Sequence, residues 1–253
     1  MKEIKIDSDQ EIILGINPAK EIIRLRPHTV KQLIINIDKS SRRINELNLL
    51  AESMSIQISE VEKSFFSQNY PNENHQGVAV LCNKRSHESE DLLDNILNQE
   101  NIFLLILDHM TDPHNVGACM RSAAAAEVDA IVVPKDRSCH LTPTVRKISS
   151  GASELIPFIV VTNLSRSIKK ISSAGVKVYG AKSDGTIKHT DVDMRGNVAI
   201  VIGSEDKGLK ELTAKTCNAL ISIEMPGNID SLNASVTAGI ILFEYLRQNK
   251  HAF

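Results

Sequence analysis

From about residue 99 onward, short runs rich in Ile and Val alternate with segments of helical pattern, and this alternation restricts the fold more than any other feature. Uncharged runs of this kind are typical of strands buried on both faces of a parallel sheet. We therefore predict an α/β domain with a parallel sheet. Its strands are predicted at 102–107, 130–133, 158–161, 176–179, 198–202 and 219–223, and its clearest helices at 116–126, 165–173 and 234–248.

The first 83 residues carry a smaller α/β pattern of their own. Asn17 is a suitable N-cap and Pro18 a suitable first residue for a helix that Pro27 should end. Strands at 32–36 and 77–82 and an amphipathic helix at 42–54 are also predicted. The stretch 84–98 is polar and runs into a short helix, as interdomain linkers often do. The predicted domains are therefore 1–83 and 99–253, joined by a linker at 84–98.

Composition and charge exclude several classes of protein. The chain has 29 basic and 31 acidic residues, a net charge of −2, so bulk positive charge is no argument for a nucleic-acid partner. Aromatic residues make up 4% and Trp is absent, which argues against a base-stacking platform. No apolar run approaches the ~18 residues of a membrane span. The start has no apolar signal-peptide core, so we expect a cytoplasmic protein.

Neither metal binding nor thiol chemistry has a pattern in this chain. The four cysteines include no CxxC pair and are expected to be reduced thiols. No HExxH motif or comparable ligand spacing occurs, so no metal is expected. Basic residues do gather early in the chain, where they are either contacts for RNA phosphates or ordinary solvated helix faces. They are Lys20, Arg24, Arg26, Lys31, Arg42 and Arg43.

The first candidate site is the segment 112–123, which follows a predicted strand and opens an alanine-rich helix. Ligands in open α/β sheets bind where strands end and helices begin. Arg121 lies one helical turn beyond Gly117 on the same face, and an Arg in that place can hold a phosphate. A helix capped by Asn115 with a solvated Arg121 explains the segment equally well.

Two further segments each follow a predicted strand. In 201–209, Gly203 and Gly208 have the spacing of a P-loop, but the Lys and Ser/Thr that a P-loop requires are missing. This segment is either a ligand loop or a tight turn between strand and helix. In 223–239, a Pro-Gly loop precedes a helix of small residues that Ser231 or Asn233 can cap. Capping and packing account for that segment about as well as function does.

Taken in this order, the three segments make the chain similar to the SpoU class of RNA ribose 2′-O-methyltransferases, within the SPOUT superfamily. The segments 112–123, 197–209 and 221–244 resemble the three motifs of that class, and 141–152 is similar to a family segment between them. The segments 15–21 and 75–79 resemble a substrate-binding extension. That extension is found in the bacterial members that methylate a guanosine ribose in 23S rRNA.

The resemblance implies a knotted parallel-sheet methyltransferase domain at the C-terminus and a small L30e-like α/β domain at the N-terminus. It also implies S-adenosyl-L-methionine as cofactor, 23S ribosomal RNA as partner, a homodimer, and no membrane or metal. Five positions match the catalytic polar residues of the class: Asn115, Arg121, Glu205, Ser231 and Asn233. Four are expected to bind the cofactor: Gly203, Ile223 and Leu232 match positions that line the family's cofactor pocket, and Met225 lies beside them. Asp206 and Glu224 stand where relatives often have Gly and Pro.

The expected function is methylation of the 2′-oxygen of a guanosine ribose in 23S rRNA. A sulfonium methyl donor needs only in-line positioning against the ribose oxygen. Arg121 is either the base or an electrostatic clamp, and we favour the clamp because a guanidinium stays protonated. Two alternatives remain open. One is the same chemistry on tRNA or another rRNA site, including a resistance-type enzyme, and the other is a non-catalytic RNA-binding assembly factor. The intact polar residues count against the latter.

Overall fold

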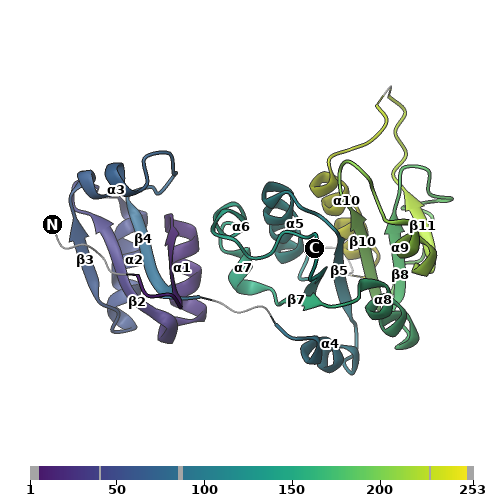
Figure 1. Cartoon of the computed structure of the whole chain (residues 1–253), viewed down its shortest axis with the longest axis horizontal. Helices are drawn as coiled ribbons and strands as arrows, with labels where there is room; N and C mark the ends of the chain where they lie inside the picture. The colour runs from purple at the N-terminus through teal and green to yellow at the C-terminus, as the bar shows by residue number, and fades with distance from the viewer. Residues whose placement is uncertain (1–5, 40, 85–87, 228, 250–253) are drawn as a thin grey trace. The chain divides into compact units, whose positions relative to one another are not determined.

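The structure is a computed structural model of the 253-residue chain, and it describes residues 6–39, 41–84, 88–227 and 229–249 (Figure 1). The chain divides into two compact units. The N-terminal unit comprises Met1–Ser86 and Arg146–Leu155, and the C-terminal unit comprises His87–Val145 and Ile156–Phe253. Among the described residues, no helix combines the length and the apolar character needed to cross a membrane.

The N-terminal unit is a four-stranded mixed sheet with helices on both faces. Its strand order is β1-β4-β2-β3, with β4 antiparallel to β1 and β2, and β3 parallel to β2. Helices α1 and α2 bury Ile22 and Leu47 against one face, and α3 buries Phe66 against the other. The elements are β1 (Gln10–Leu14), α1 (Ile16–Leu25), β2 (Val30–Asn36), α2 (Arg42–Ser53), β3 (Ile58–Val61), α3 (Lys63–Asn69) and β4 (Val78–Asn83).

The start of α1 differs from the prediction. Gly15, with φ of 104°, precedes the helix, and the N–H of Ile16 donates to Oε1 of Gln76 at 3.1 Å. Asn17 is therefore not the N-cap. It lies on the helix surface, where its side-chain oxygen accepts a hydrogen bond from Arg43. Through Gln76, the two segments that resemble a substrate-binding extension meet in space.

The segment Arg146–Leu155 contributes a buried ion cluster to the N-terminal unit, although it lies between the first and second motifs in sequence. It contains α7 (Ala152–Leu155) and part of α6 (Pro143–Ile148). The side chain of Arg146 is only 2% exposed and lies 2.9 Å from a carboxylate oxygen of Glu154. Glu154 also pairs with Arg26, whose Nε lies 2.7 Å from Oε2. Arg26 is thus held inside the unit and is not an exposed cation.

The C-terminal unit is built on a seven-stranded sheet with the order β7-β6-β5-β10-β8-β11-β9, and every paired strand is parallel to its neighbour. This confirms the predicted parallel α/β fold. The strands are β5 (Phe103–Asp108), β6 (Ala130–Pro134), β7 (Phe158–Val161), β8 (Lys177–Ala181), β9 (Ile187–Lys188), β10 (Val198–Gly203) and β11 (Ala219–Ser222). The helices are α4 (Glu90–Leu97), α5 (Pro113–Ala125), α8 (Leu164–Ser173), α9 (Glu211–Thr216) and α10 (Ala234–Asn249).

Helices cover both faces of this sheet, which explains why its central strands are continuously apolar. Leu104 and Ile106 of β5 pack in a cluster with the buried residues of α4 and α8. Phe103 points to the opposite face, where its ring stacks on Tyr245 of α10 with centroids 3.6 Å apart. On that face α10 also packs against α5, and a side chain at Gly239 would lie 3.5 Å from Ser122.

The strand order reverses direction next to β5. The chain leaves β5 toward β6 and β7 on one side, and later returns to place β10 on the other side. In open α/β sheets, ligands bind in the crevice at the carboxyl ends of the strands at such a switch point. The fold therefore predicts a ligand site near the carboxyl ends of β5 and β10, whose last residues are Asp108 and Gly203.

Candidate functional site

A pocket of about 310 Å³ opens at the carboxyl ends of β8, β10 and β11. Its volume is at the lower end of the range of small-ligand sites. Apolar side chains form part of its lining, and the Ser231 hydroxyl and the Glu205 carboxylate are among its polar groups. All four residues predicted to bind the cofactor are in the lining: Gly203, Ile223, Met225 and Leu232.

The glycine loop after β10 forms one wall of this pocket. A Cβ at Gly203 would lie 2.1 Å from the carbonyl carbon of Gly208, so no side chain fits there. The loop closes on itself, since the N–H of Gly208 donates to the carbonyl oxygen of Ser204 at 2.8 Å. Gly208 has φ of 60°, which glycine adopts without strain. Close backbone packing thus requires the first glycine and backbone conformation favours the second.

The two departures from the family pattern lie outside this lining. Asp206 is exposed in the loop and Glu224 is exposed after β11. The Glu224 carboxylate pairs with Nζ of Lys188 at 2.9 Å. Neither side chain narrows the pocket.

Asn233 joins the three motifs through its side-chain amide. Its Oδ1 accepts the N–H groups of Ser235 at 2.8 Å and Val236 at 3.3 Å, so Asn233 is the cap of α10. Its Nδ2 donates to Oδ1 of Asn115 at 3.0 Å and also to the Glu205 carboxylate. Both amide hydrogens are used, which holds the side chain in one orientation. Asn115 is itself buried, at the start of α5.

Asn115 does not cap α5, as the structural alternative would require. The cap is Asp112, whose carboxylate accepts the N–H of His114 at 3.0 Å. The amide of Asn115 is thereby left to bind Asn233, and two side chains 118 residues apart meet.

Arg121 and Ser231 stand apart from this bridge. Arg121 is exposed on α5 and makes no hydrogen bond or ion pair with any residue that the structure describes. It lies six residues beyond Asn115, which turns it about 120° around the helix from that side chain. Ser231 is exposed in the loop before α10 and lines the pocket. The structure therefore brings together Asn115, Glu205 and Asn233. Ser231 shares only the pocket lining with Glu205, and Arg121 lies on another face of α5.

Cys119 lies on α5 close to the site, but it is unsuited to nucleophilic chemistry. Burial raises the pKa of its thiol to about 12, and the negative charge of Glu205 acts in the same direction. The protein interior thus keeps Cys119 protonated and closed to solvent. Within the described ranges, no three His, Cys, Asp or Glu side chains gather in a group able to hold a metal ion.

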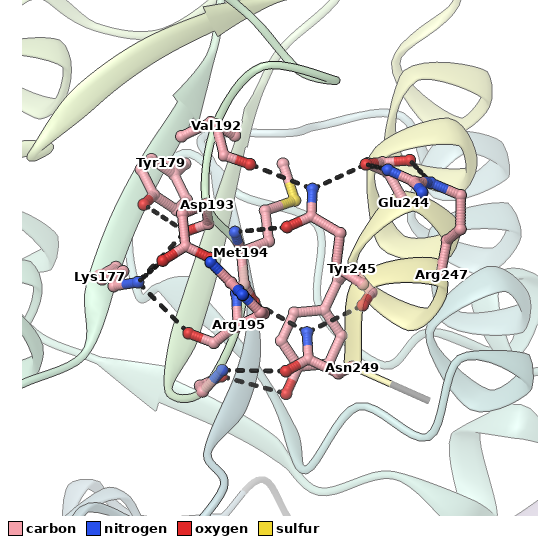
Figure 2. Close-up of polar contacts among 12 residues, drawn as sticks. Lys177, Tyr179, Val192, Asp193, Met194, Arg195, Glu244, Tyr245, Arg247 and Asn249 are labelled. Atoms are coloured by element: carbon pink, nitrogen blue, oxygen red, sulfur yellow. Dashed lines mark hydrogen bonds and ion pairs between the residues drawn. The ribbon is translucent and has the colours of Figure 1, made fainter. Parts of the chain in front are cut away.

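A set of side-chain amides fastens the far end of α10 to the segment 192–196, which precedes β10 (Figure 2). Gln248 accepts the N–H of Met194 at 2.8 Å. Asn249 accepts the N–H of Gly196 at 2.9 Å and donates to the carbonyl oxygen of Met194 at 2.8 Å. We call this set the C-terminal clasp. The helix that carries Asn233 is therefore held at both ends, and no sequence motif had pointed to either of the clasp amides.

Comparison with known proteins agrees with this geometry. Residues 102–243 match the SpoU rRNA Methylase family, and residues 12–88 match the family described as RNA 2'-O ribose methyltransferase substrate binding. The two matches together span most of the chain.

Two proteins that are similar along nearly the whole chain have the same name. The 23S rRNA (guanosine-2'-O-)-methyltransferase RlmB of Xanthomonas campestris is 38% identical over 238 residues, which cover 93% of this chain and 96% of that protein. The protein of the same name from Escherichia coli K12 is 37% identical over 239 residues, 94% of this chain and 98% of that one.

Solved structures show the same fold. The SpoU methyltransferase AviRb from Streptomyces viridochromogenes, crystallised with AdoMet, superimposes with a TM-score of 0.78. The match covers 95% of this chain and 91% of that one at 21% identity. With its methylase match, its full-length relatives and the junction of the three motifs at one pocket, the chain belongs to the SpoU rRNA methylase family.

Proposed function

We propose that this protein transfers the methyl group of S-adenosyl-L-methionine to the 2′-oxygen of a guanosine ribose in 23S rRNA. The observation that carries the proposal is the Asn233 amide, which connects Asn115 of the first motif to Glu205 of the second beside the pocket. The relatives named for this reaction align with the N-terminal unit as well as the C-terminal one.

The pocket lining suits this cofactor. Ile223, Met225 and Leu232 offer an apolar surface for an adenine ring, and the tight loop at Gly203 lets a ligand approach the backbone. Glu205 supplies a polar group for the charged end of the molecule. When bound, S-adenosyl-L-methionine supplies an activated methyl group on a positively charged sulfur.

Side chains of the protein would position the ribose hydroxyl and stabilise the charge that develops on its oxygen. The bridge between Asn115, Asn233 and Glu205 is rigid, because each group is hydrogen-bonded before any ligand arrives. We assign Arg121 the role of an electrostatic clamp on an RNA phosphate and on the developing alkoxide, since a guanidinium remains protonated. The clamped phosphate would accept the proton of the 2′-hydroxyl as the methyl group leaves the cofactor's sulfur for the ribose oxygen. Ser231, exposed at the pocket, is assigned to substrate positioning.

The proposal is tested by incubating the purified protein with cofactor labelled in its methyl group and with full-length 23S rRNA. We expect the label to appear in 2′-O-methylguanosine after nuclease digestion of the RNA. We also expect the cofactor to bind without added metal. Label found only in tRNA or in another rRNA site would favour the alternative substrates. Cofactor-dependent RNA binding without any label would favour an assembly factor.

We also propose the domain organisation that the resemblance implies. Residues 1–83 bind the RNA substrate through an L30e-like domain, and 84–98 form the linker, whose helix α4 packs on the C-terminal unit. Residues 99–253 form a methyltransferase domain with a trefoil knot, apart from 146–155, which pack with the N-terminal unit. Support for the first domain comes from the substrate-binding match at 12–88. Because ribosomes assemble in the cytoplasm, we propose that the protein acts there.

We propose further that the protein is a homodimer. Val236 and Phe243 of α10 lie seven residues apart on one side of the helix, and each is 49% exposed. Exposed apolar stripes of this kind often mark an interface. Light scattering should give twice the monomer mass for the native chain and a smaller mass for Phe243→Asp. Leu212→Asp, at an apolar residue of α9 that is 61% exposed, is the matched control and should leave the mass unchanged.

A further inference from the structure

Asp108, the last residue of β5, is a fully buried carboxylate outside the pocket lining. Its Oδ2 accepts the backbone N–H of Lys210 at 2.7 Å, and its Oδ1 contacts Nδ1 of His109. A buried carboxylate is unfavourable unless it is hydrogen-bonded. The bond to Lys210 therefore joins the end of β5 firmly to a segment 102 residues further along the chain.

This bond anchors the second end of the glycine loop. The strand register pairs Asp108 with Gly203, where the loop begins, and Lys210 is the residue where it ends and α9 follows. Lys210 is the N-cap residue of α9, and its side chain makes no capping hydrogen bond to that helix. The first end of the loop is held by the strand ladder of β10, and the second end is held by the Asp108 carboxylate.

The loop between these anchors forms the pocket wall. Gly203, Ser204, Glu205 and Leu209 all line the pocket. Glu205 also accepts the amide of Asn233, so the loop determines where the bridge of polar residues stands. Asp108 itself does not reach the pocket, and any effect on the ligand must pass through the loop.

We infer that Asp108 is a positioning residue, whose carboxylate holds the glycine loop in the conformation that binds the cofactor and thereby sets cofactor affinity. The inference rests on the proposed function of the pocket. A loop that is ordered only part of the time lowers the apparent affinity by the fraction that is competent. Once the cofactor is bound the loop is ordered again, so kcat at saturating cofactor should hardly change.

The first test is calorimetric titration of the full chain with S-adenosyl-L-methionine. Asp108→Ala should raise the Kd about tenfold, in line with the loss of a charge-assisted hydrogen bond. Asp108→Asn keeps an oxygen that can accept the Lys210 N–H, and its Kd should stay within about threefold of the native value. For both variants kcat at saturating cofactor should be close to native.

Asp129 provides a matched control at the other end of the same strand. Its Oδ2 accepts the N–H of Phe103, the first residue of β5, at 2.7 Å. Asp129→Ala therefore removes a bond of the same type and length from the same strand. It should lower the melting temperature while leaving the Kd unchanged.

Lys210 tests the same bond from the donor side. Its φ of −61° is compatible with proline, which has no N–H to donate. Lys210→Pro should raise the Kd about as much as Asp108→Ala, whereas Lys210→Ala, which keeps the N–H, should not. Both Lys210 variants keep the Asp108 carboxylate. They therefore test whether the Asp108–Lys210 hydrogen bond sets cofactor affinity even if Asp108→Ala does not fold.

Amide hydrogen exchange of the cofactor-free protein gives a readout that does not depend on activity. Exchange in the segment 204–210 should be faster in Asp108→Ala and Lys210→Pro, and native-like in Asp129→Ala and Lys210→Ala. Native Kd and native exchange in folded Asp108→Ala or Lys210→Pro would overturn the inference, and so would an equal loss of affinity in Asp129→Ala. Failure of the native protein to bind the cofactor would instead reject the proposed function, with exchange still reporting on the anchor.

Discussion

For Arg121, the resemblance predicts a catalytic role that its contacts in the structure do not by themselves reveal. It is exposed on α5 and has no polar partner among the described residues. Truncation should therefore hardly affect stability. If Arg121 stabilises charge in the transition state, Arg121→Ala should lower kcat by ~10²-fold or more with cofactor affinity unchanged. Arg121→Lys keeps the charge but loses the planar fork, and should recover only part of the rate.

Single-turnover methylation of an rRNA fragment, with thermal melts of each variant, measures this. Arg166→Ala is the control, because Arg166 is 68% exposed and pairs with Glu90 at the surface. Native rates in folded Arg121→Ala would remove Arg121 from the mechanism.

Asn233 combines a structural and a functional role that two substitutions separate. Asn233→Ser keeps an oxygen to cap α10 but removes the amide that reaches Asn115 and Glu205. It should leave the melting temperature nearly native and reduce single-turnover rates about tenfold or more. Asn233→Ala loses the cap as well, and should cost about 1 kcal/mol in the free energy of unfolding. Equal rates for native protein and Asn233→Ser would show that the bridge only supports the fold.

At the scale of elements, the C-terminal clasp should be a large contributor to the anchoring of α10. The double variant Gln248→Ala, Asn249→Ala leaves backbone groups of the segment 192–196 without these partners (Figure 2). Each part-buried group that loses its partner costs about 1–3 kcal/mol. Urea unfolding should show a loss of that order. Lys170→Ala, which removes an exposed ion pair on α8, should show almost none, and a similar loss in both variants would contradict the role of the clasp.

The elements themselves were predictable where their pattern was long. The buried strands β5, β6 and β10 and the helices α2, α8 and α10 lie within a few residues of their predicted bounds. The short elements β3, α3 and β9 were not predicted, because four, seven and two residues carry too little periodicity. The start of α1 was misplaced because its first N–H is satisfied by Gln76, 60 residues away.

At the scale of the whole molecule, RNA docking should depend on the exposed cations of α1 and α2. Lys20, Arg24, Arg42 and Arg43 are exposed, whereas Arg26 is paired with Glu154 inside the N-terminal unit. Replacing those four by Ala should weaken RNA binding. The logarithm of the binding constant falls linearly with the logarithm of the salt concentration. The fourfold variant should reduce the magnitude of that slope by about 0.7–0.9 for each RNA phosphate that these cations neutralise in the native complex.

Filter binding at several salt concentrations measures that slope. Lys63→Ala is the control, since Lys63 opens α3 on the opposite face of the same sheet. An unchanged slope in the fourfold variant would place RNA docking elsewhere.

The stability of the whole chain should fall at alkaline pH. Burial raises the pKa of Cys82, Cys119 and Cys217 to about 12, from an ordinary value of 9.0. Above pH 9 the unfolded chain loses thiol protons that the folded chain retains, so unfolding is favoured as the pH rises toward 12. At about pH 10 each thiol should cost about 1.4 kcal/mol. Urea unfolding from about pH 7.5 to 10 should show a smaller fall in the free energy of unfolding for Cys119→Ala than for the native chain. The same dependence of that free energy on pH in both proteins would contradict this.

The sequence by itself determined the class of fold, the order of the motifs and the residue types that meet at the site. Local pattern suffices for these, because strand burial, loop glycines and capping residues are properties of neighbouring positions.

Only the tertiary structure decided which residues touch. It placed β10 beside β5, so that Asp108 holds Lys210, and it brought Asn115 within 3.0 Å of Asn233. It also placed Arg146 in the N-terminal unit rather than with the strands that flank it in sequence. The contacts between β5, β10, Lys210, Asn115 and Asn233 span about a hundred residues and depend on strand order and crossover, which no local periodicity encodes.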